Sequence, residues 1–123
     1  MPAPREVYAF KNYFLDFYRA QTADVRMKIK FVLKVLREVN IISEKYLKHI
    51  CGEIYELRAG FGSNIFRVFC CFDEGNIIVL YHGFQKKTDE TPHREIEKAL
   101  RIHKEYQQAK AEGKITDFLR GTP

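Results

Sequence analysis

The chain has 123 residues, of which 46% are hydrophobic and 14% aromatic, and its 21 Lys and Arg against 16 Asp and Glu give a formal net charge of +5. This length leaves room for one domain, and the apolar content excludes a disordered chain. The positive charge favours a polyanionic partner without proving one. We expect a single domain over residues 1–123, with a flexible tail from about residue 110.

The three cysteines are Cys51, Cys70 and Cys71, and their spacing fits neither a disulfide framework nor a zinc-binding pattern. Cys70 and Cys71 are adjacent in a predicted strand, so their side chains should point to opposite faces. The sequence therefore predicts no metal and no cofactor. The N-terminus lacks the apolar stretch of a signal peptide, and no apolar run is long enough to span a membrane. We expect a cytoplasmic protein with no membrane partner.

The first half of the chain is predicted to form one strand and then helices, over residues 7–10, 11–19, 25–39 and 43–50. In the third of these segments apolar residues recur at steps of three and four, which is typical of an amphipathic helix. Thr22 or Asp24 is predicted to cap this helix, and Asn40 to end it. The last segment is expected to add one or two helical turns closed by Gly52.

The second half is rich in Ile, Val, Phe and Tyr, and it predicts three strands over residues 53–58, 65–72 and 76–84. Glycines and the run 73–76 indicate two tight hairpin connections between them. A final helix is predicted from Pro92 to Tyr106, followed by a short helical turn near Phe118 and a frayed end at residues 121–123.

This order predicts an α+β domain. A short N-terminal strand and a three-stranded meander would form an antiparallel sheet, with two N-terminal helices and one C-terminal helix packed against it.

One strand carries a charged residue in an apolar setting. In residues 65–72, one face consists of Phe66, Val68, Cys70 and Phe72, whereas Arg67 lies on the other. A lone arginine there must reach water, an acidic partner or a bound anion. Arg58, which ends the preceding strand, should lie near Arg67 across the hairpin.

More cations follow the third strand, at Lys86 and Lys87. Together with the two arginines they are predicted to converge on one edge of the sheet, where they would suit a phosphate group. The alternative is that Arg58 pairs with Glu56 or Glu53 and that the lysines form a solvated turn.

These residues carry a family resemblance. The motifs are residues 54–58 (Ile-Tyr-Glu-Leu-Arg), 66–69 with Phe72, 79–88 (ending Gly-Phe-Gln-Lys-Lys-Thr), and Thr91-Pro92 with the helix that follows. They resemble the HigB-like, phage-related branch of the RelE/ParE toxin superfamily over roughly residues 8–107. The most specific feature is the pairing of Glu-Leu-Arg with the later Gly-Phe-x-Lys-Lys-Thr.

The resemblance implies the toxin of a type II toxin–antitoxin system, with a RelE-like fold and cleavage of mRNA in the ribosomal decoding site. It also implies an antitoxin that carries a helix-turn-helix domain. The complex would contact operator DNA only through this antitoxin. By position, Arg67 matches the family's strand arginine at the scissile phosphate, Arg58 the basic residue ending the preceding strand, and Lys86, less securely Lys87, the basic position after the last strand.

Such an endoribonuclease needs no metal. The 2′-hydroxyl of the RNA attacks the adjacent phosphate, which leaves a cyclic phosphate and a 5′-hydroxyl end. Arg67, Arg58 and Lys86 are the expected catalytic cations. Glu56 lies where RelE-like members tend to have a basic residue, so the acid–base group stays open between Glu56, His82 and Tyr81.

The remaining predicted RNA contacts are Lys87, Tyr55 and Phe84, with the two aromatic rings as candidates to stack on a base. Two other functions stay open. One is a ParE-like toxin that inhibits DNA gyrase, and the other is a catalytically inactive module that binds the antitoxin as a co-repressor.

Overall fold

The computed structural model describes residues 4–86 and 92–123, and it contains one six-stranded sheet in the order β2-β3-β4-β5-β1-β6. The strands are β1 (Glu6–Phe10), β2 (Leu47–Cys51), β3 (Ile54–Phe61), β4 (Asn64–Asp73), β5 (Ile77–Lys86) and β6 (Leu119–Gly121). The helices are α1 (Tyr13–Arg19), α2 (Ala23–Glu38), α3 (His93–Ala111) and α4 (Ile115–Phe118).

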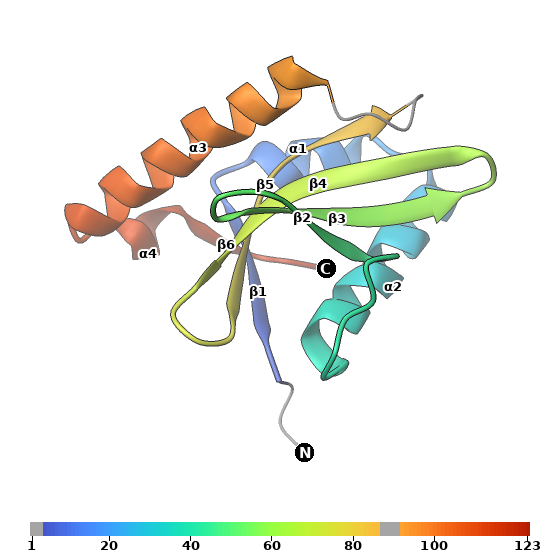
Figure 1. Cartoon of the computed structure of the whole chain (residues 1–123), viewed down its shortest axis with the longest axis horizontal. Helices are drawn as coiled ribbons and strands as arrows, with labels where there is room; N and C mark the ends of the chain where they lie inside the picture. Colours follow the sequence, from blue (N-terminus) through green and yellow to red (C-terminus); the bar gives the residue numbers. More distant parts are fainter. Residues whose placement is uncertain (1–3, 87–91) are drawn as a thin grey trace.

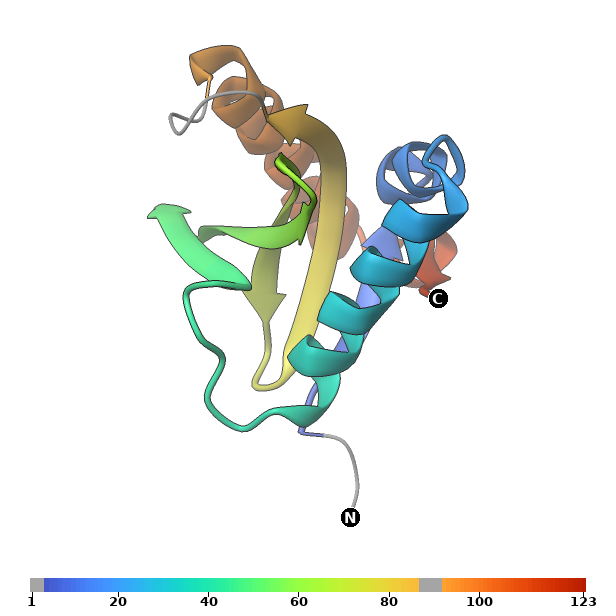
Figure 2. The ribbon, with the colours of Figure 1, turned by 90° about the vertical axis from the view of Figure 1, so that its right-hand side faces the viewer.

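The sheet is sandwiched between helices, with α1 and α2 on one face and α3 on the other (Figures 1 and 2). Each face has its own hydrophobic core. The α2 face buries residues such as Val32, Leu57 and Val68, and the α3 face buries residues such as Phe69 and Ile102. The predicted α+β class is confirmed. The sheet is mostly antiparallel, although β1 pairs parallel with β5.

The amphipathic helix α2 forms as predicted. Its apolar stripe of Val25, Ile29, Val32, Leu33 and Leu36 is buried, and the hydroxyl of Thr22 accepts a hydrogen bond from the backbone N–H of Val25 at 3.4 Å. The helix ends at Glu38, two residues before the predicted stop. The first helix also starts later than predicted, at Tyr13, because the backbone of Lys11 has a positive φ of 55°.

The prediction of helical turns over residues 43–50 was wrong. Leu47–Cys51 is strand β2, antiparallel to β3, and the Tyr46 carbonyl accepts a 2.8 Å hydrogen bond from the N–H of Arg58. So short a segment nucleates a helix poorly. The exposed edge of β3, by contrast, offers a row of unpaired backbone groups.

The predicted frayed end was also wrong. Leu119–Gly121 is strand β6, antiparallel to β1. The Thr122 hydroxyl donates to the Val7 carbonyl at 2.9 Å, and Arg37 donates to the Pro123 carbonyl at 3.0 Å. These contacts tie the C-terminus to β1 and α2, and they cover a sheet edge that would otherwise be unpaired.

The meander of β3, β4 and β5 has the predicted order and tight turns, with positive φ at Gly62 and Gly75. The two adjacent cysteines face opposite ways as predicted, Cys70 into the α2-side core and Cys71 into the α3-side core. Gly83 in β5 lies against the Phe17 ring of α1, where an added Cβ would come within 2.4–2.7 Å of ring carbons. Only glycine allows α1 to pack this closely on β5.

Candidate functional site

Three predicted site residues form a row across the sheet. Arg58 of β3 is paired in register with Arg67 of β4, and Arg67 is in turn paired with Phe84 of β5. One step further along the strands, Glu56 is paired with Phe69. Because side chains two residues apart on a strand share a face, Glu56 lies on the same face as the two arginines.

The Glu56 carboxylate lies between the two guanidinium groups. Its Oε1 accepts a hydrogen bond from Nη1 of Arg67, and it lies 3.7 Å from Nε of Arg58. The Arg67 side chain is only 2% exposed and that of Glu56 0% exposed. The predicted pairing of Arg58 with Glu56 therefore occurs, and Arg67 reaches an acidic partner of the chain itself.

This ion pair leaves much of Arg67 unused. Its Nε and Nη2 are buried and have no hydrogen-bond partner among the described residues. An arginine side chain has five N–H donors, and leaving them unpaired away from water costs free energy. Arg67 therefore has two buried nitrogens whose donors its contact with Glu56 leaves unused.

His82 shows the same incomplete pairing. Its Nε2 lies 3.1 Å from a carboxylate oxygen of Glu95 at the start of α3, but its buried Nδ1 has no partner in the part of the chain that the structure describes. Burial lowers the pKa of His82, the Glu95 carboxylate opposes this shift, and the nearby Lys98 and Arg101 lower the pKa further. The net shift favours the neutral imidazole.

Aromatic rings separate the arginine row from His82. The Phe69 ring centroid lies 5.4 Å from that of Phe84 and 5.3 Å from that of His82. Phe84 is half-buried, so one part of its ring stays open to a partner. Tyr55, the other predicted stacking residue, lies elsewhere. It packs against the α2-side core, with its ring 5.0 Å from that of Phe72.

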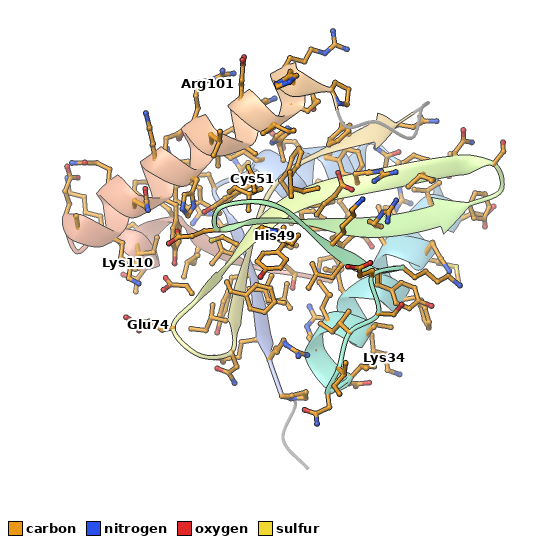
Figure 3. All side chains as sticks on the ribbon, viewed as in Figure 1. Lys34, His49, Cys51, Glu74, Arg101 and Lys110 are labelled. Carbon is orange, nitrogen blue, oxygen red and sulfur yellow. The ribbon has the colours of Figure 1, made fainter. Side chains whose placement is uncertain are left out.

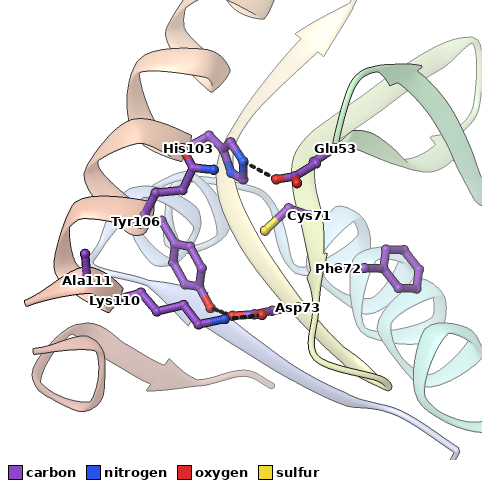
Figure 4. Close-up of a pocket in the computed structure, with 9 residues that line it drawn as sticks. Glu53, Cys71, Phe72, Asp73, His103, Tyr106, Lys110 and Ala111 are labelled. Atoms are coloured by element: carbon purple, nitrogen blue, oxygen red, sulfur yellow. Dashed lines mark hydrogen bonds and ion pairs between the residues drawn. The ribbon is translucent and has the colours of Figure 1, made fainter. Parts of the chain in front are cut away.

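The structure places Tyr81 in a hydrogen-bonded chain that leads through His103 to Glu53 at the protein surface, and Figure 4 shows the contact between His103 and Glu53. Its hydroxyl lies 3.0 Å from Cys71 Sγ and 2.7 Å from His103 Nδ1, and His103 Nε2 lies 2.7 Å from Glu53. Burial raises the pKa of Tyr81 well above its usual value, and the neighbouring Cys71 raises it further.

Three members of this chain, Glu53, Cys71 and His103, line a pocket of about 400 Å³. A second cluster of paired side chains lines the same pocket. The Asp73 carboxylate accepts hydrogen bonds from the hydroxyl of Tyr106 and, at 2.5 Å, from Nζ of Lys110 (Figure 4). Although burial raises the pKa of Asp73, these two hydrogen bonds hold it below its usual value.

The two predicted lysines are only partly described. The backbone of Lys86 pairs with Ile65 at the end of β5, whereas its side chain, like the whole of Lys87, lies outside the described residues.

Sequence reasoning missed Glu95, His103 and Asp73. Glu95 and His103 lie eight residues apart on α3, and periodicity shows only that they share a helix with an apolar stripe. Their partners are His82 of β5 and Glu53, which directly precedes β3, so no spacing along the chain predicts these contacts.

Within residues 4–86 and 92–123, no three His, Cys, Asp or Glu side chains gather in a way that would hold a metal ion. No helix in this part of the chain is both long and apolar enough to cross a membrane.

The fold is that of a small α+β protein, and one face of its sheet carries Arg58 and Arg67 with the Glu56 carboxylate between them. Residues 16–104 match the family described as Phage derived protein Gp49-like (DUF891). The match covers well over half of the chain, which therefore belongs to this family, a RelE/HigB-like toxin family of toxin–antitoxin systems. Membership points to a toxin with an antitoxin partner. No curated protein matches the chain significantly. The narrower assignment to the HigB branch stays a prediction.

Proposed function

We propose that this toxin is an mRNA endoribonuclease that acts on the ribosome, with Arg67 at the scissile phosphate. The observation that carries the proposal is the pair of buried, unpartnered nitrogens of Arg67 next to Arg58. A polar group left unpaired in the free protein is well suited to a charged ligand, and arginine binds phosphate through paired hydrogen bonds.

The reaction needs charge stabilisation and two proton transfers. The 2′-oxygen of the RNA attacks the adjacent phosphorus while its proton passes to a base. The bond from phosphorus to the 5′-oxygen then breaks as that oxygen gains a proton. In this scheme Nε and Nη2 of Arg67 donate to the non-bridging oxygens, and Arg58 adds positive charge beside them. A cyclic phosphate and a 5′-hydroxyl end result.

Among the three acid–base candidates, His82 is the best suited. Its neutral form is favoured, and Nδ1 has a free lone pair or proton. Glu56 is a weaker choice of base because its carboxylate already accepts a hydrogen bond from Arg67. Tyr81 is bonded to Cys71 and His103, and its raised pKa opposes ionisation.

The RNA contacts are proposed to include Phe84, whose half-buried ring adjoins Arg67, together with Lys86 and Lys87. Tyr55 is left out of this set because its ring lies on the α2 side of the sheet. The antitoxin is proposed to carry a helix-turn-helix domain and to make all contact with operator DNA.

One observation favours a second function. The almost complete burial of Arg67 and Glu56 is what a structural ion pair would show. A chain in which the pair is only structural would be the catalytically inactive, antitoxin-binding module.

The experiment compares induced expression of the wild type, Arg67→Ala and Arg19→Ala in bacteria, with mapping of mRNA 5′ ends. Arg19 is exposed on α1, so its substitution removes the same charge on the other side of the sheet. We expect growth arrest and new 5′ ends inside reading frames for the wild type and Arg19→Ala, and neither for Arg67→Ala.

Antitoxin co-purification serves as the folding control for each variant. Cleavage of purified mRNA only when ribosomes are present would establish the ribosome dependence. An Arg67→Ala variant that binds antitoxin and still cuts mRNA would overturn the role of Arg67. Wild-type arrest without new mRNA ends but with a DNA-damage response would instead indicate gyrase inhibition, and no arrest at all would indicate the inactive module.

A further inference from the structure

A basic pocket lies beside Arg58, at the open edge of the β3–β4 hairpin. It is a pocket of about 320 Å³ formed by parts of α2, the segment before β2, and the hairpin. Its lining residues are Lys28, Lys45, Tyr46, Arg58, Gly60, Gly62 and Ile65.

The charge of this pocket is one-sided. Lys28, Lys45 and Arg58 come from three separate segments, and among the described residues no carboxylate lines this pocket, although Glu56 lies 3.7 Å from Nε of Arg58. Neither lysine takes part in an ion pair of the described residues. Like charges repel, so three cations around one hollow suit an anion that enters it.

The lysines are held in place without using their N–H donors. Nζ of Lys28 lies 5.0 Å from the centroid of the Phe31 ring, and Nζ of Lys45 lies 5.6 Å from that of Tyr46. A ring face attracts an ammonium group but accepts no strong hydrogen bond from it. Both ammonium groups therefore stay available to phosphate oxygens.

Arg58 connects this pocket with the candidate active site. Its backbone is in register with Arg67, its Nε approaches Glu56 at 3.7 Å, and its Nη1 donates to the Glu44 carbonyl at 3.4 Å. Its guanidinium group thus lies between the buried ion pair and the pocket. A strand whose scissile phosphate contacts Arg67 has a neighbouring nucleotide close to the pocket.

The other walls suit a nucleotide better than a peptide side chain. Tyr46 is half-buried: its ring lies 6.0 Å from that of Phe31 and Nζ of Lys45 lies 5.6 Å from its centroid, which leaves only its exposed part for stacking on a base. A Cβ placed on Gly60 or Gly62 would meet nothing within 4 Å, so the backbone there is open to close approach. The volume is near the lower end of small-ligand pockets, which is too small for an antitoxin helix.

We propose that this pocket binds one nucleotide of the RNA strand next to the cleavage point, with its phosphate on Lys28, Lys45 and Arg58 and its base against Tyr46. The proposal rests on the proposed function, but it concerns binding and not cleavage. The pocket would thereby contribute to the choice of sequence that is cut.

The experiment measures binding of a fluorescent, 2′-O-methylated single-stranded RNA to the full chain made by cell-free synthesis. The 2′-O-methyl groups prevent cleavage. We expect the variant Lys28→Ala/Lys45→Ala to bind more weakly and to reduce the slope of log affinity against log salt by about 0.7, which corresponds to one phosphate that is no longer neutralised on a single strand. Tyr46→Leu should weaken binding about tenfold through lost stacking.

The matched control is Lys30→Ala/Lys34→Ala, which removes the same charge from α2 outside the pocket. Lys34 lies on the half of α2 away from the hairpin (Figure 3). Equal losses in the two double variants would show a general electrostatic field and overturn the pocket. The pocket would also be overturned if Lys28→Ala/Lys45→Ala bound RNA as tightly as the wild type does, whether or not it lost antitoxin binding. It would likewise be overturned if the wild-type protein bound no RNA at low salt.

Failure of the pocket and failure of the proposed function are separable. If RNA binding depends on Lys28 and Lys45 but no mRNA is cut in cells, the nuclease function fails and the pocket stands. If mRNA is cut in an Arg67-dependent way while both double variants bind RNA alike, the pocket fails and the nuclease function stands.

Discussion

The side of the sheet that faces α3 carries two groups of polar side chains, one near Asp73 and Tyr81 and the other near Arg67 and His82. We call these the paired end and the unpaired end, because they differ in how completely the buried polar atoms have hydrogen-bond partners. At one end, Cys71, Tyr81, His103 and Glu53 form a continuous chain of hydrogen bonds, and Asp73 is held by two donors. At the other end, Arg67 and His82 together account for all three of the buried, unpartnered side-chain nitrogens in the described part of the chain.

This difference in pairing distinguishes side chains with a structural role from candidates for binding a ligand. At the paired end, the buried members of the network all have partners, and the network connects α3 to the sheet. Burial raises the pKa of the Cys71 thiol to about 11, which leaves it protonated and unreactive near neutral pH. A partly paired site costs folding free energy, and a ligand that completes the pairing would recover that cost. The proposed RNA-binding site thus lies at the unpaired end, and we propose a structural role for the paired end.

The largest expected effect comes from removing the carboxylate between the arginines. Glu56→Ala leaves Arg67 buried without an opposite charge in contact, so we expect a loss of about 3–5 kcal/mol in the free energy of unfolding. The measurement is urea denaturation followed by far-UV circular dichroism.

The control for this variant removes both charges. Glu56→Gln/Arg67→Met should recover most of the lost stability, because no isolated charge remains buried. A loss below about 1 kcal/mol for Glu56→Ala would show that water or another group already solvates Arg67, and the contrast between the two ends would disappear.

A smaller effect is expected at the paired end. Asp73→Ala removes the acceptor of the buried Tyr106 hydroxyl, and we expect a loss of about 1–3 kcal/mol in the free energy of unfolding. In a Tyr106→Phe background the same substitution should cost less, because no hydroxyl is left unpaired. RNA binding should not change in either variant. Weaker RNA binding by a folded Asp73→Ala protein would contradict the purely structural role of this end.

Much of the fold follows from periodicity in the sequence. The apolar spacing of α2 is a local pattern that predicted its buried face correctly. Strand β4 is instead buried on both faces over residues 66–71, and Phe72 is exposed. Strand β6 was missed because its stability comes from pairing with β1, which is distant in sequence. Strand β2 pairs with β3 across a short hairpin at residues 52–53, and Gly52 was predicted there as the end of helical turns. Leu119 pairs with Phe10, and no local pattern contains that information.

The candidate site was predictable to the same extent. Arg58 and Arg67 were expected to meet across a hairpin, and they do. Strand alternation already excluded Tyr55, since a residue three positions before Arg58 faces the other side of the sheet. The pairing of β4 with β5 shifts register between Val68 and Cys70, and both Tyr81 and His82 contact α3. Simple alternation does not predict such a shift.

The smallest expected effect tests His82 by pH. Its pKa is lowered in the folded protein, chiefly by burial, so the folded state binds this proton less readily than the unfolded state does. The stability due to the neutral side chain is complete above the usual histidine pKa of about 6.5, and it is lost as the pH falls through the lowered value. Urea midpoints measured across this range should fall more for the wild type than for His82→Gln, while His49→Gln, which alters an exposed histidine of β2, should keep the wild-type slope.

The groups that face His82 are Glu95, Lys98 and Arg101 of α3, so the same comparison measures their balance. A wild type that gains stability on acidification relative to His82→Gln would mean that attraction to Glu95 outweighs burial. His82 would then be charged near neutral pH and unable to serve as the base, and the unpaired end would retain Arg67 alone as its site for RNA.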